Sequence, residues 1–175
     1  MQKFKIIILL SVMPAGVKST IAKKFLYSTI SSDIKIGYVP GDTVAHLVFN
    51  CQYTETEMNL KYINMKNIIN QLSSYCDVIF IEDFFKRDAD LNEILKCCKN
   101  IAPLHTYSLI CSYETAIQRN FYREKEQSLP LKILESYYQK FLPFNIQGDI
   151  KLNSETLSVE EISNILLTDV ITSIK

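Results

Sequence analysis

FKIIILLSVMPAGVKST, residues 4–20, is the stretch that decides the fold class of this chain. Residues 4–10 form a nearly continuous, isoleucine-rich run, which is typical of a central β-strand covered on both faces. A turn containing Pro14 and Gly16 follows the run. Over residues 19–31 the apolar side chains then recur at helical spacing. The sequence therefore predicts a strand, a loop and a helix in immediate succession.

The rest of the chain continues this alternation of strands and helices. We expect further strands over residues 34–39, 78–81, 106–111 and 149–152. We expect helices over residues 43–49, 54–74, 90–99 and 114–126, another that opens at Pro130, and a C-terminal helix after a capping box at 158–161. Five strands alternating with helices predict an α/β domain with a mainly parallel sheet, in which ligands bind beyond the carboxyl ends of the strands.

The composition is that of one globular domain. The chain has 175 residues, 47% of them hydrophobic, and only four Gly and five Pro, so it can bury a core and is unlike collagen-like or disordered chains. Lys and Arg balance Asp and Glu at 19 each, which excludes a global positive field for nucleic acid or anionic lipid. We expect a single domain over residues 1–175.

The N-terminal residues imitate a secretory signal, because Lys3 and Lys5 precede an apolar run. The run is short, however, and no small-x-small cleavage site follows it before Lys18. No run elsewhere approaches the roughly 18 apolar residues of a membrane span. Five cysteines without C-x-x-C or Cys/His ligand spacing indicate reduced thiols. We therefore expect a cytoplasmic protein without a membrane partner.

The loop after the first strand has the chemistry of a phosphate-binding loop. Such a loop needs backbone N–H groups at a helix N-terminus, a lysine that reaches the β- and γ-phosphates and a hydroxyl for Mg²⁺. Lys18 and Ser19 fill the last two roles, and the predicted nucleotide-binding residues are Ala15, Gly16, Val17, Lys18, Ser19 and Thr20. The strict pattern G-x-x-x-x-G-K-[ST] would place glycine at Val12 and Val17. The alternative is a turn with a surface lysine.

Carboxylates follow the next two predicted strands. Asp42 comes directly after Pro40 and Gly41, where it is placed either to act as a general base or to cap the following helix. Glu82 and Asp83 end the third strand, where a carboxylate could hold Mg²⁺ or the water bound to it. A solvated loop is the alternative for this pair. We rank Glu82 ahead as the metal ligand.

Arginine is rare in this chain and stands at three positions. Arg119 and Arg123 are four residues apart on the helix predicted over 114–126, so both guanidinium groups would project from one face. An anion such as a triphosphate would relieve their repulsion, whereas Glu124 and Glu126 offer a solvated alternative. Arg87 follows the third strand and is a candidate for contacting a phosphate of the acceptor.

These segments resemble the P-loop kinases related to 5′-hydroxyl polynucleotide kinases, including the kinase domain of the phage enzyme. The resemblance spans nearly the whole chain, and it is carried by MPAGVKST at 13–20, by Gly41-Asp42, by QRNxxR at 118–123, and by the LP and YY pairs at 129–130 and 137–138. It implies a P-loop NTPase fold with five parallel strands and a helical lid around 113–130. By this resemblance Lys18 and Ser19 bind Mg·ATP, Asp42 is the general base, and Arg119 and Arg123 clamp the triphosphate.

The acceptor is less defined than the nucleotide. Ala45 stands where polynucleotide kinases of this family place an arginine that grips a phosphate of the acceptor. We therefore expect an ATP- and Mg²⁺-dependent kinase that acts on a hydroxyl group, with a polynucleotide 5′-OH as the first acceptor to consider. A small hydroxylated molecule, such as a nucleoside, sugar or antibiotic, is one alternative. An inactive nucleotide-binding or structural module is the other, because of the two loop valines.

Overall fold

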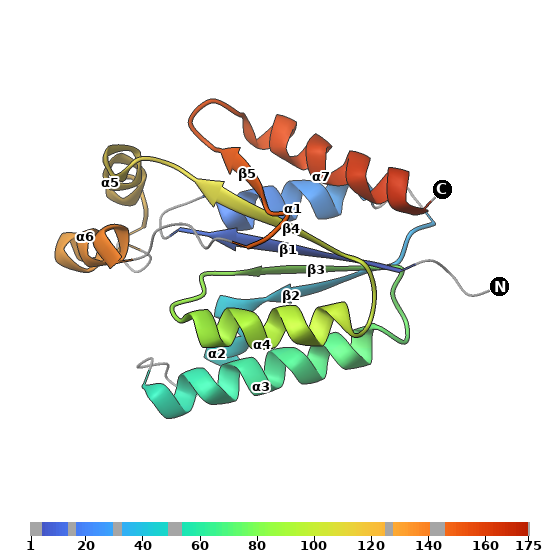
Figure 1. Cartoon of the computed structure of the whole chain (residues 1–175). Helices are drawn as coiled ribbons and strands as arrows, with labels where there is room; N and C mark the ends of the chain where they lie inside the picture. Colours follow the sequence, from blue (N-terminus) through green and yellow to red (C-terminus); the bar gives the residue numbers. More distant parts are fainter. Residues whose placement is uncertain are drawn as a thin grey trace.

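A five-stranded sheet forms the centre of the molecule in the computed structural model, which describes residues 5–13, 17–29, 33–48, 54–124, 128–140 and 146–174. The strands are β1 (Ile6–Val12), β2 (Ile36–Pro40), β3 (Val78–Asp83), β4 (Leu104–Ile110) and β5 (Ile150–Asn153). Their order across the sheet is β2-β3-β1-β4-β5, and every neighbouring pair is parallel (Figure 1). The predicted fold class, an α/β domain with a parallel five-stranded sheet, is confirmed.

Helices cover both faces of the sheet and also the end of the sheet where the carboxyl ends of the strands meet, which we call the carboxyl edge. They are α1 (Lys18–Thr29), α2 (Gly41–Val48), α3 (Glu55–Leu72), α4 (Asp88–Lys99), α5 (Tyr113–Phe121), α6 (Leu131–Lys140) and α7 (Val159–Ile174). Figure 1 shows α1 and α7 on one face and α3 and α4 on the other. Helices α5 and α6 lie beyond the carboxyl ends of the strands. A separate helical pair thus lies at this carboxyl edge of the sheet (Figure 1).

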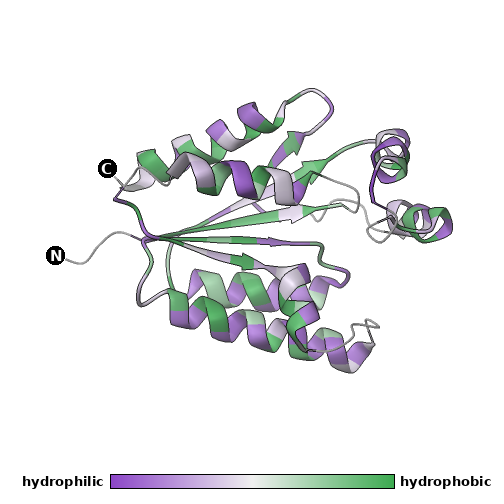
Figure 2. Ribbon diagram, turned by 180° about the vertical axis from the view of Figure 1, so that it is seen from behind, coloured by the Kyte–Doolittle hydropathy of each residue, from purple (hydrophilic) through white to green (hydrophobic). Residues whose placement is uncertain are grey.

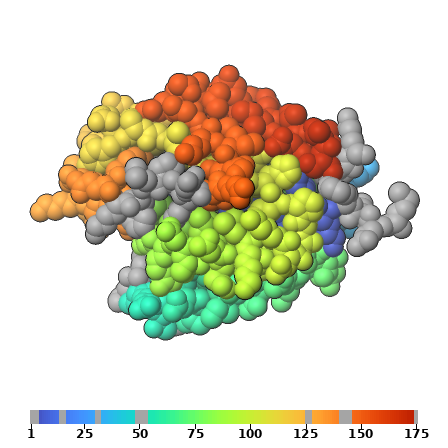
Figure 3. All heavy atoms as spheres, in the orientation of Figure 1, coloured from blue at the N-terminus to red at the C-terminus, as the bar shows by residue number. Residues whose placement is uncertain are grey.

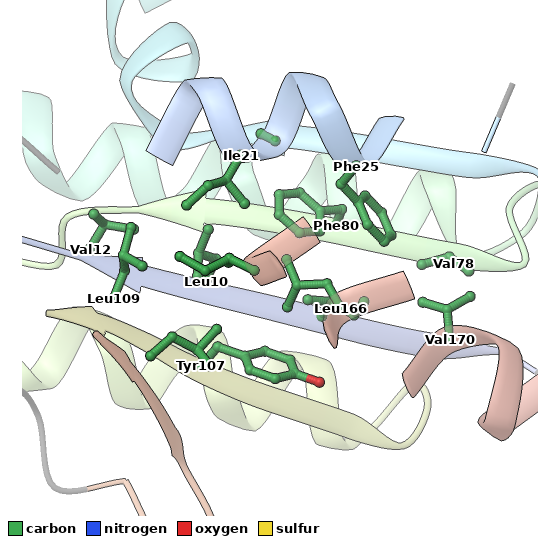
Figure 4. Close-up of a cluster of buried hydrophobic side chains, with 14 of the residues drawn as sticks. Leu10, Val12, Ile21, Phe25, Val78, Phe80, Tyr107, Leu109, Leu166 and Val170 are labelled. Carbon is green, nitrogen blue, oxygen red and sulfur yellow. The ribbon is translucent and has the colours of Figure 1, made fainter. Parts of the chain in front are cut away.

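Alternate side chains of β1 face the two helical layers, and all seven are buried. Ile6, Ile8 and Leu10 belong to the apolar cluster shared with α1 and α7, of which Figure 4 gives a close-up. Ile7 and Leu9 belong to the cluster shared with α3 and α4. In Figure 2 the strands are largely green, whereas the helices alternate between green and purple. The period of two in a strand thus divides one apolar run between two cores.

Both capping boxes expected from the sequence are formed. The Thr54 hydroxyl accepts a hydrogen bond from the Glu57 amide at 3.3 Å, and the Glu57 carboxylate accepts one from the Thr54 amide at 2.8 Å. Ser158 and Glu161 repeat the arrangement at 3.2 and 2.7 Å. Because each box satisfies otherwise unpaired N–H groups, it fixes where its helix begins.

Helix α5 is shorter than the helix predicted over 114–126, which is a correction. It ends at Phe121, so Arg123 lies beyond the helix and does not share a helical face with Arg119. The reason lies in the side chain of Asn120, which is 3% exposed. Its amide nitrogen donates to the Leu129 carbonyl at 2.8 Å, and its amide oxygen accepts from the Leu129 N–H at 2.9 Å. These two hydrogen bonds tie the end of α5 to the chain that leads into α6.

Candidate active site

The sheet brings the predicted site residues of three strands to one edge. Lys18 is the first residue of α1, which follows β1, and Asp42 lies in the first turn of α2, which follows β2. Glu82 and Asp83 are the last two residues of β3, which lies between those strands in the sheet. Because the strands are parallel, their carboxyl ends meet at the same edge. The contacts among these side chains define the candidate site.

Lys18 and Asp42 form an ion pair, with the Lys18 amine donating to Oδ2 of Asp42. Burial by itself lowers the pKa of Lys18, but the charges of Asp42, Glu82 and Asp83 more than offset it, so that pKa is raised. Burial by itself raises the pKa of Asp42, and Lys18 reverses this, so that pKa is lowered. Both groups are therefore charged at neutral pH. The Asp42 side chain remains 48% exposed, so a ligand can reach it.

Glu82 carries an oxygen that lacks a partner. Its Oε1 accepts a hydrogen bond from the Tyr38 hydroxyl at 2.9 Å. Its Oε2 is buried and has no hydrogen-bond partner among the described residues. Burial raises the pKa of Glu82, although Lys18 and the Tyr38 hydroxyl oppose this. An unpaired buried carboxylate oxygen is unfavourable by itself, and a cation or a water bound to a cation would satisfy it. Glu82 thus fits the Mg²⁺ role expected of it.

Asp83 is fully buried, so a solvated loop is wrong for the end of β3. Its Oδ1 accepts from the amine of Lys61 at 2.7 Å, and its Oδ2 accepts from the hydroxyl of Tyr62 at 3.0 Å. Lys61 is not among the site residues predicted from the sequence, and it is only 2% exposed. A signal was present, because Lys61 stands three residues after Met58 and four before Met65 on the apolar face of α3.

Gly41 is required by the position of Asp83. A Cβ atom added to Gly41 would lie 2.3 Å from Oδ1 of Asp83 and 2.4 Å from its carboxyl carbon. Any side chain at position 41 would therefore displace the buried carboxylate. The absence of a Cβ lets the first turn of α2 lie directly against the end of β3, and Asp42 is the next residue.

The three candidate arginines have separate environments. Arg119 donates to the Ser154 hydroxyl at 2.8 Å and to the Ser154 carbonyl at 2.7 Å, and so joins α5 to the turn after β5. Arg87 binds both carboxylate oxygens of Asp90, each at 2.6 Å. Arg123 is half-buried; burial lowers its pKa, and the charge of Asp42 opposes this. Arg123 therefore lies within electrostatic range of Asp42.

Helices α5 and α6 pack on each other through a small apolar cluster of their own. Ala116 of α5 and Leu134 of α6 are its fully buried members. In Figure 3 these helices are the yellow and orange atoms at one end of the molecule. The pair contacts the loop after β3, where the Phe84 and Tyr137 rings meet edge to face at 5.1 Å and the Lys86 amine lies 5.4 Å from the Tyr137 ring centre. The two helices therefore bridge the carboxyl edge.

Neither a family model nor a curated protein matches this chain in sequence. Its fold, however, matches solved structures. A gluconokinase from Sinorhizobium meliloti 1021 is 11% identical, over 99% of this chain and 95% of its own, with a TM-score of 0.70. The chain has the fold of the P-loop kinases. Kti12 of Chaetomium thermophilum, solved with ADP-AlF3, has this fold at 14% identity over 97% of this chain and 99% of its own, with a TM-score of 0.68. The Pnkp1/Rnl/Hen1 RNA repair complex contains a match at 15% identity over 80% of this chain and 45% of that one, with a TM-score of 0.65.

In a P-loop kinase fold the segment between β1 and α1 is where the phosphate loop lies. Ala15 and Gly16 fall outside the described residues, so their predicted contacts stay predictions. Val12 is 2% exposed and belongs to the core cluster of α1 and α7, and Val17 packs against the same cluster. The two valines thus have a packing role. Ser19 and Thr20, in the first turn of α1, are exposed.

Two kinds of feature are absent from the part of the chain that the structure describes. No helix in it is long and apolar enough to cross a membrane. It also holds no group of three or more His, Cys, Asp or Glu side chains that could bind a metal ion.

Proposed function

We propose that the protein is an ATP- and Mg²⁺-dependent kinase that transfers the γ-phosphoryl group of ATP to a hydroxyl acceptor. The observation that supports this most is the contact between Lys18 and Asp42 at the carboxyl edge. Glu82, whose Oε2 has no hydrogen-bond partner among the described residues, lies within electrostatic range of Lys18. A lysine for phosphate and a carboxylate for a hydroxyl proton are the two side chains that such a transfer needs side by side.

The residues have distinct roles in this reaction. Lys18 binds the β- and γ-phosphates, and Asp42 accepts the proton of the acceptor hydroxyl. As that oxygen bonds to the γ-phosphorus, the bond from the γ-phosphorus to the bridging oxygen breaks and ADP leaves. Ser19 and Glu82 would hold Mg²⁺, which neutralises charge on the phosphates when bound. The lowered pKa of Asp42 keeps its carboxylate ionised at neutral pH, as a general base must be.

The two arginines of the predicted lid, Arg119 and Arg123, have different roles in this proposal. Arg123 faces the triphosphate, which its electrostatic proximity to Asp42 supports. Arg119 anchors the lid through Ser154, which its two hydrogen bonds support. Arg87 would have to leave Asp90 before it could bind a phosphate of the acceptor.

Two acceptor classes follow from different observations. The QRNxxR segment at 118–123 and the structural likeness to the RNA repair complex favour a polynucleotide 5′-OH. Ala45, however, is 4% exposed and carries no charge, so it cannot bind a phosphate of a strand. This and the likeness to gluconokinase favour a small hydroxylated acceptor as the second candidate.

Calorimetry with Mg·ATP tests the nucleotide site directly. We expect Lys18-dependent binding, so that Lys18→Ala abolishes the heat of binding while the fold is kept, because Lys18 lies at the rim of the sheet. Lys24→Ala is the matched control, since Lys24 belongs to the same helix and pairs with Glu160 at 3.0 Å away from the site. Transfer from γ-labelled ATP to 5′-OH oligonucleotides and then to sugars and nucleosides identifies the acceptor.

The outcomes separate the proposal from its alternative. Equal binding by the wild type and Lys18→Ala would contradict a working phosphate loop around Lys18. No binding by the wild type at millimolar Mg·ATP would contradict the kinase and favour an inactive module, in which the valines at 12 and 17 have closed the loop.

A further inference from the structure

Two lysine–carboxylate pairs lie at the carboxyl edge, and they differ in burial. In the first, the side chains of Lys18 and Asp42 are 15% and 48% exposed. In the second, those of Lys61 and Asp83 are 3% and 0% exposed. A buried ion pair contributes little net stability, because removing both charges from water offsets their attraction. The second pair therefore calls for an explanation other than stability.

Asp83 is a potential competitor for Lys18. Its charge contributes to raising the pKa of Lys18, so the two groups lie within electrostatic range of each other. Asp83 also lies against Gly41, next to Asp42 in the chain. A buried carboxylate without a partner would attract the nearest mobile cation strongly, since charges interact more strongly away from water. The lysine side chain at the start of α1 is such a cation.

Both oxygens of Asp83 are already occupied by residues of α3. Lys61 supplies a positive charge to Oδ1 at 2.7 Å, and Tyr62 supplies a hydroxyl proton to Oδ2 at 3.0 Å. The two are neighbours in the sequence, and the Lys61 amine lies 5.0 Å from the centre of the Tyr62 ring. Together they satisfy both oxygens of the carboxylate from α3, which lies on one face of the sheet (Figure 1).

We infer that Lys61 and Tyr62 are positioning residues that reserve Lys18 for Asp42 and for the phosphates of the nucleotide, by occupying both oxygens of Asp83. Neither side chain touches a substrate, since both are buried. The inference deepens the proposed function and rests on it where nucleotide binding is measured. It assigns to two residues of α3 a part in the site.

Replacing Lys61 tests the inference through a residue that cannot contact nucleotide. In Lys61→Met, Asp83 captures Lys18, and we expect Mg·ATP to bind about tenfold more weakly, within the range of couplings measured between neighbouring charged residues. Adding Asp83→Asn removes the competing charge, and binding should return to within about threefold of the wild type. Lys66→Met is the matched control, because it breaks a Lys–Glu pair on the same helix away from the site.

A gentler variant keeps the test decisive if Lys61→Met does not fold. Tyr62→Phe leaves Lys61 in place but frees Oδ2 of Asp83, and we expect a two- to threefold loss of Mg·ATP affinity that Asp83→Asn reverses. Tyr107→Phe is its control, since it removes another Tyr–Asp hydrogen bond, to Asp169 of α7. A purely structural role would lower thermal stability in all these variants without changing the affinity of the folded protein.

Crystal structures of the variants give a readout that needs no nucleotide. In Tyr62→Phe or Lys61→Met the Lys18 amine should move from Asp42 to Asp83, and with Asp83→Asn added it should return to Asp42. A Lys18 amine that stays on Asp42 in the single variants overturns the inference, as does an affinity that Asp83→Asn fails to restore. If the wild type itself does not bind Mg·ATP, the kinase proposal is overturned. The position of the Lys18 amine in the crystal structures of the variants would still test the inference about Lys61 and Tyr62.

Discussion

At the scale of single residues, the candidate site contains two carboxylates, Asp42 and Glu82, whose pKa values are shifted by burial and by neighbouring groups. Burial raises the pKa of Asp42 and Lys18 reverses it, whereas for Glu82 burial prevails. The pKa values of two carboxylates in one cluster are thus shifted in opposite directions. Asp42 stays ionised at neutral pH, and the burial penalty on ionised Glu82 would be relieved by a bound cation.

Asp42→Asn separates proton transfer from nucleotide binding. We expect Mg·ATP affinity to be kept and phosphoryl transfer to fall by roughly 10²- to 10⁴-fold, the usual loss for a general base. In the wild type the lowered pKa of Asp42 predicts that activity falls only when the pH drops below the ordinary range of an aspartate. Steady-state rates across the acid pH range measure this. Unchanged transfer in Asp42→Asn would leave Asp42 as a helix residue only.

At the scale of elements, α5 differs most from the pattern in the sequence. Helical periodicity continues past Phe121, and nothing local marks the end of α5 as strongly as a glycine or proline would. The end is set by the two hydrogen bonds between the Asn120 side chain and the backbone of Leu129, nine residues away. The α5–α6 hairpin is thereby closed over a cluster of its own, and Arg123 lies beyond the helix, within electrostatic range of Asp42.

Asn120→Ala should loosen this hairpin without unfolding the domain. It leaves the Leu129 N–H and C=O without their side-chain partner, and a hydrogen bond contributes about 1 kcal/mol net. We expect hydrogen exchange at the Leu129 amide to accelerate roughly five- to tenfold. Gln118→Ala, at an exposed position of the same helix, is the control. Equal exchange in both variants would show that the packing of α5 on α6 holds the turn alone.

At the scale of the whole molecule, stability and function make opposite demands on Glu82. Its folded-state pKa is raised by burial, so the folded protein binds this proton more readily than the unfolded chain does. The ionised carboxylate therefore lowers the free energy of unfolding at neutral pH. That penalty is lost as the pH falls through the raised pKa and then through the pKa of the unfolded chain.

Glu82→Gln should consequently stabilise the protein at pH 7. Tyr38 can still donate to the amide oxygen, and no charge is buried. The gain over the wild type should shrink as the pH falls below the raised pKa, and urea unfolding at several pH values measures it. Mg²⁺-dependent nucleotide binding should weaken in the same variant. Destabilisation at neutral pH would mean that the Glu82 charge is already compensated; Glu114→Gln, at an exposed position on α5, is the control.

Much of the fold could be predicted from local patterns. The isoleucine-rich run of β1, the period of the helices and the two capping boxes each depend on neighbours a few residues apart, and all of them appear in the structure. The placement of Lys18, Asp42 and Glu82 at one edge followed from parallel strands alone. The roles of Lys61 and Gly41 did not, because each depends on Asp83, a residue far along the chain.

The sequence by itself determined the α/β class, the sequence of strands and helices, and the strand ends at which charged residues gather. Only the tertiary structure decided which charges meet. Lys18 pairs with Asp42 across 24 residues, Lys61 with Asp83 across 22, and Arg119 with Ser154 across 35. The physical reason is that periodicity and capping are local properties of the chain. The partner of a charge depends instead on the register and packing of elements that are far apart in the sequence.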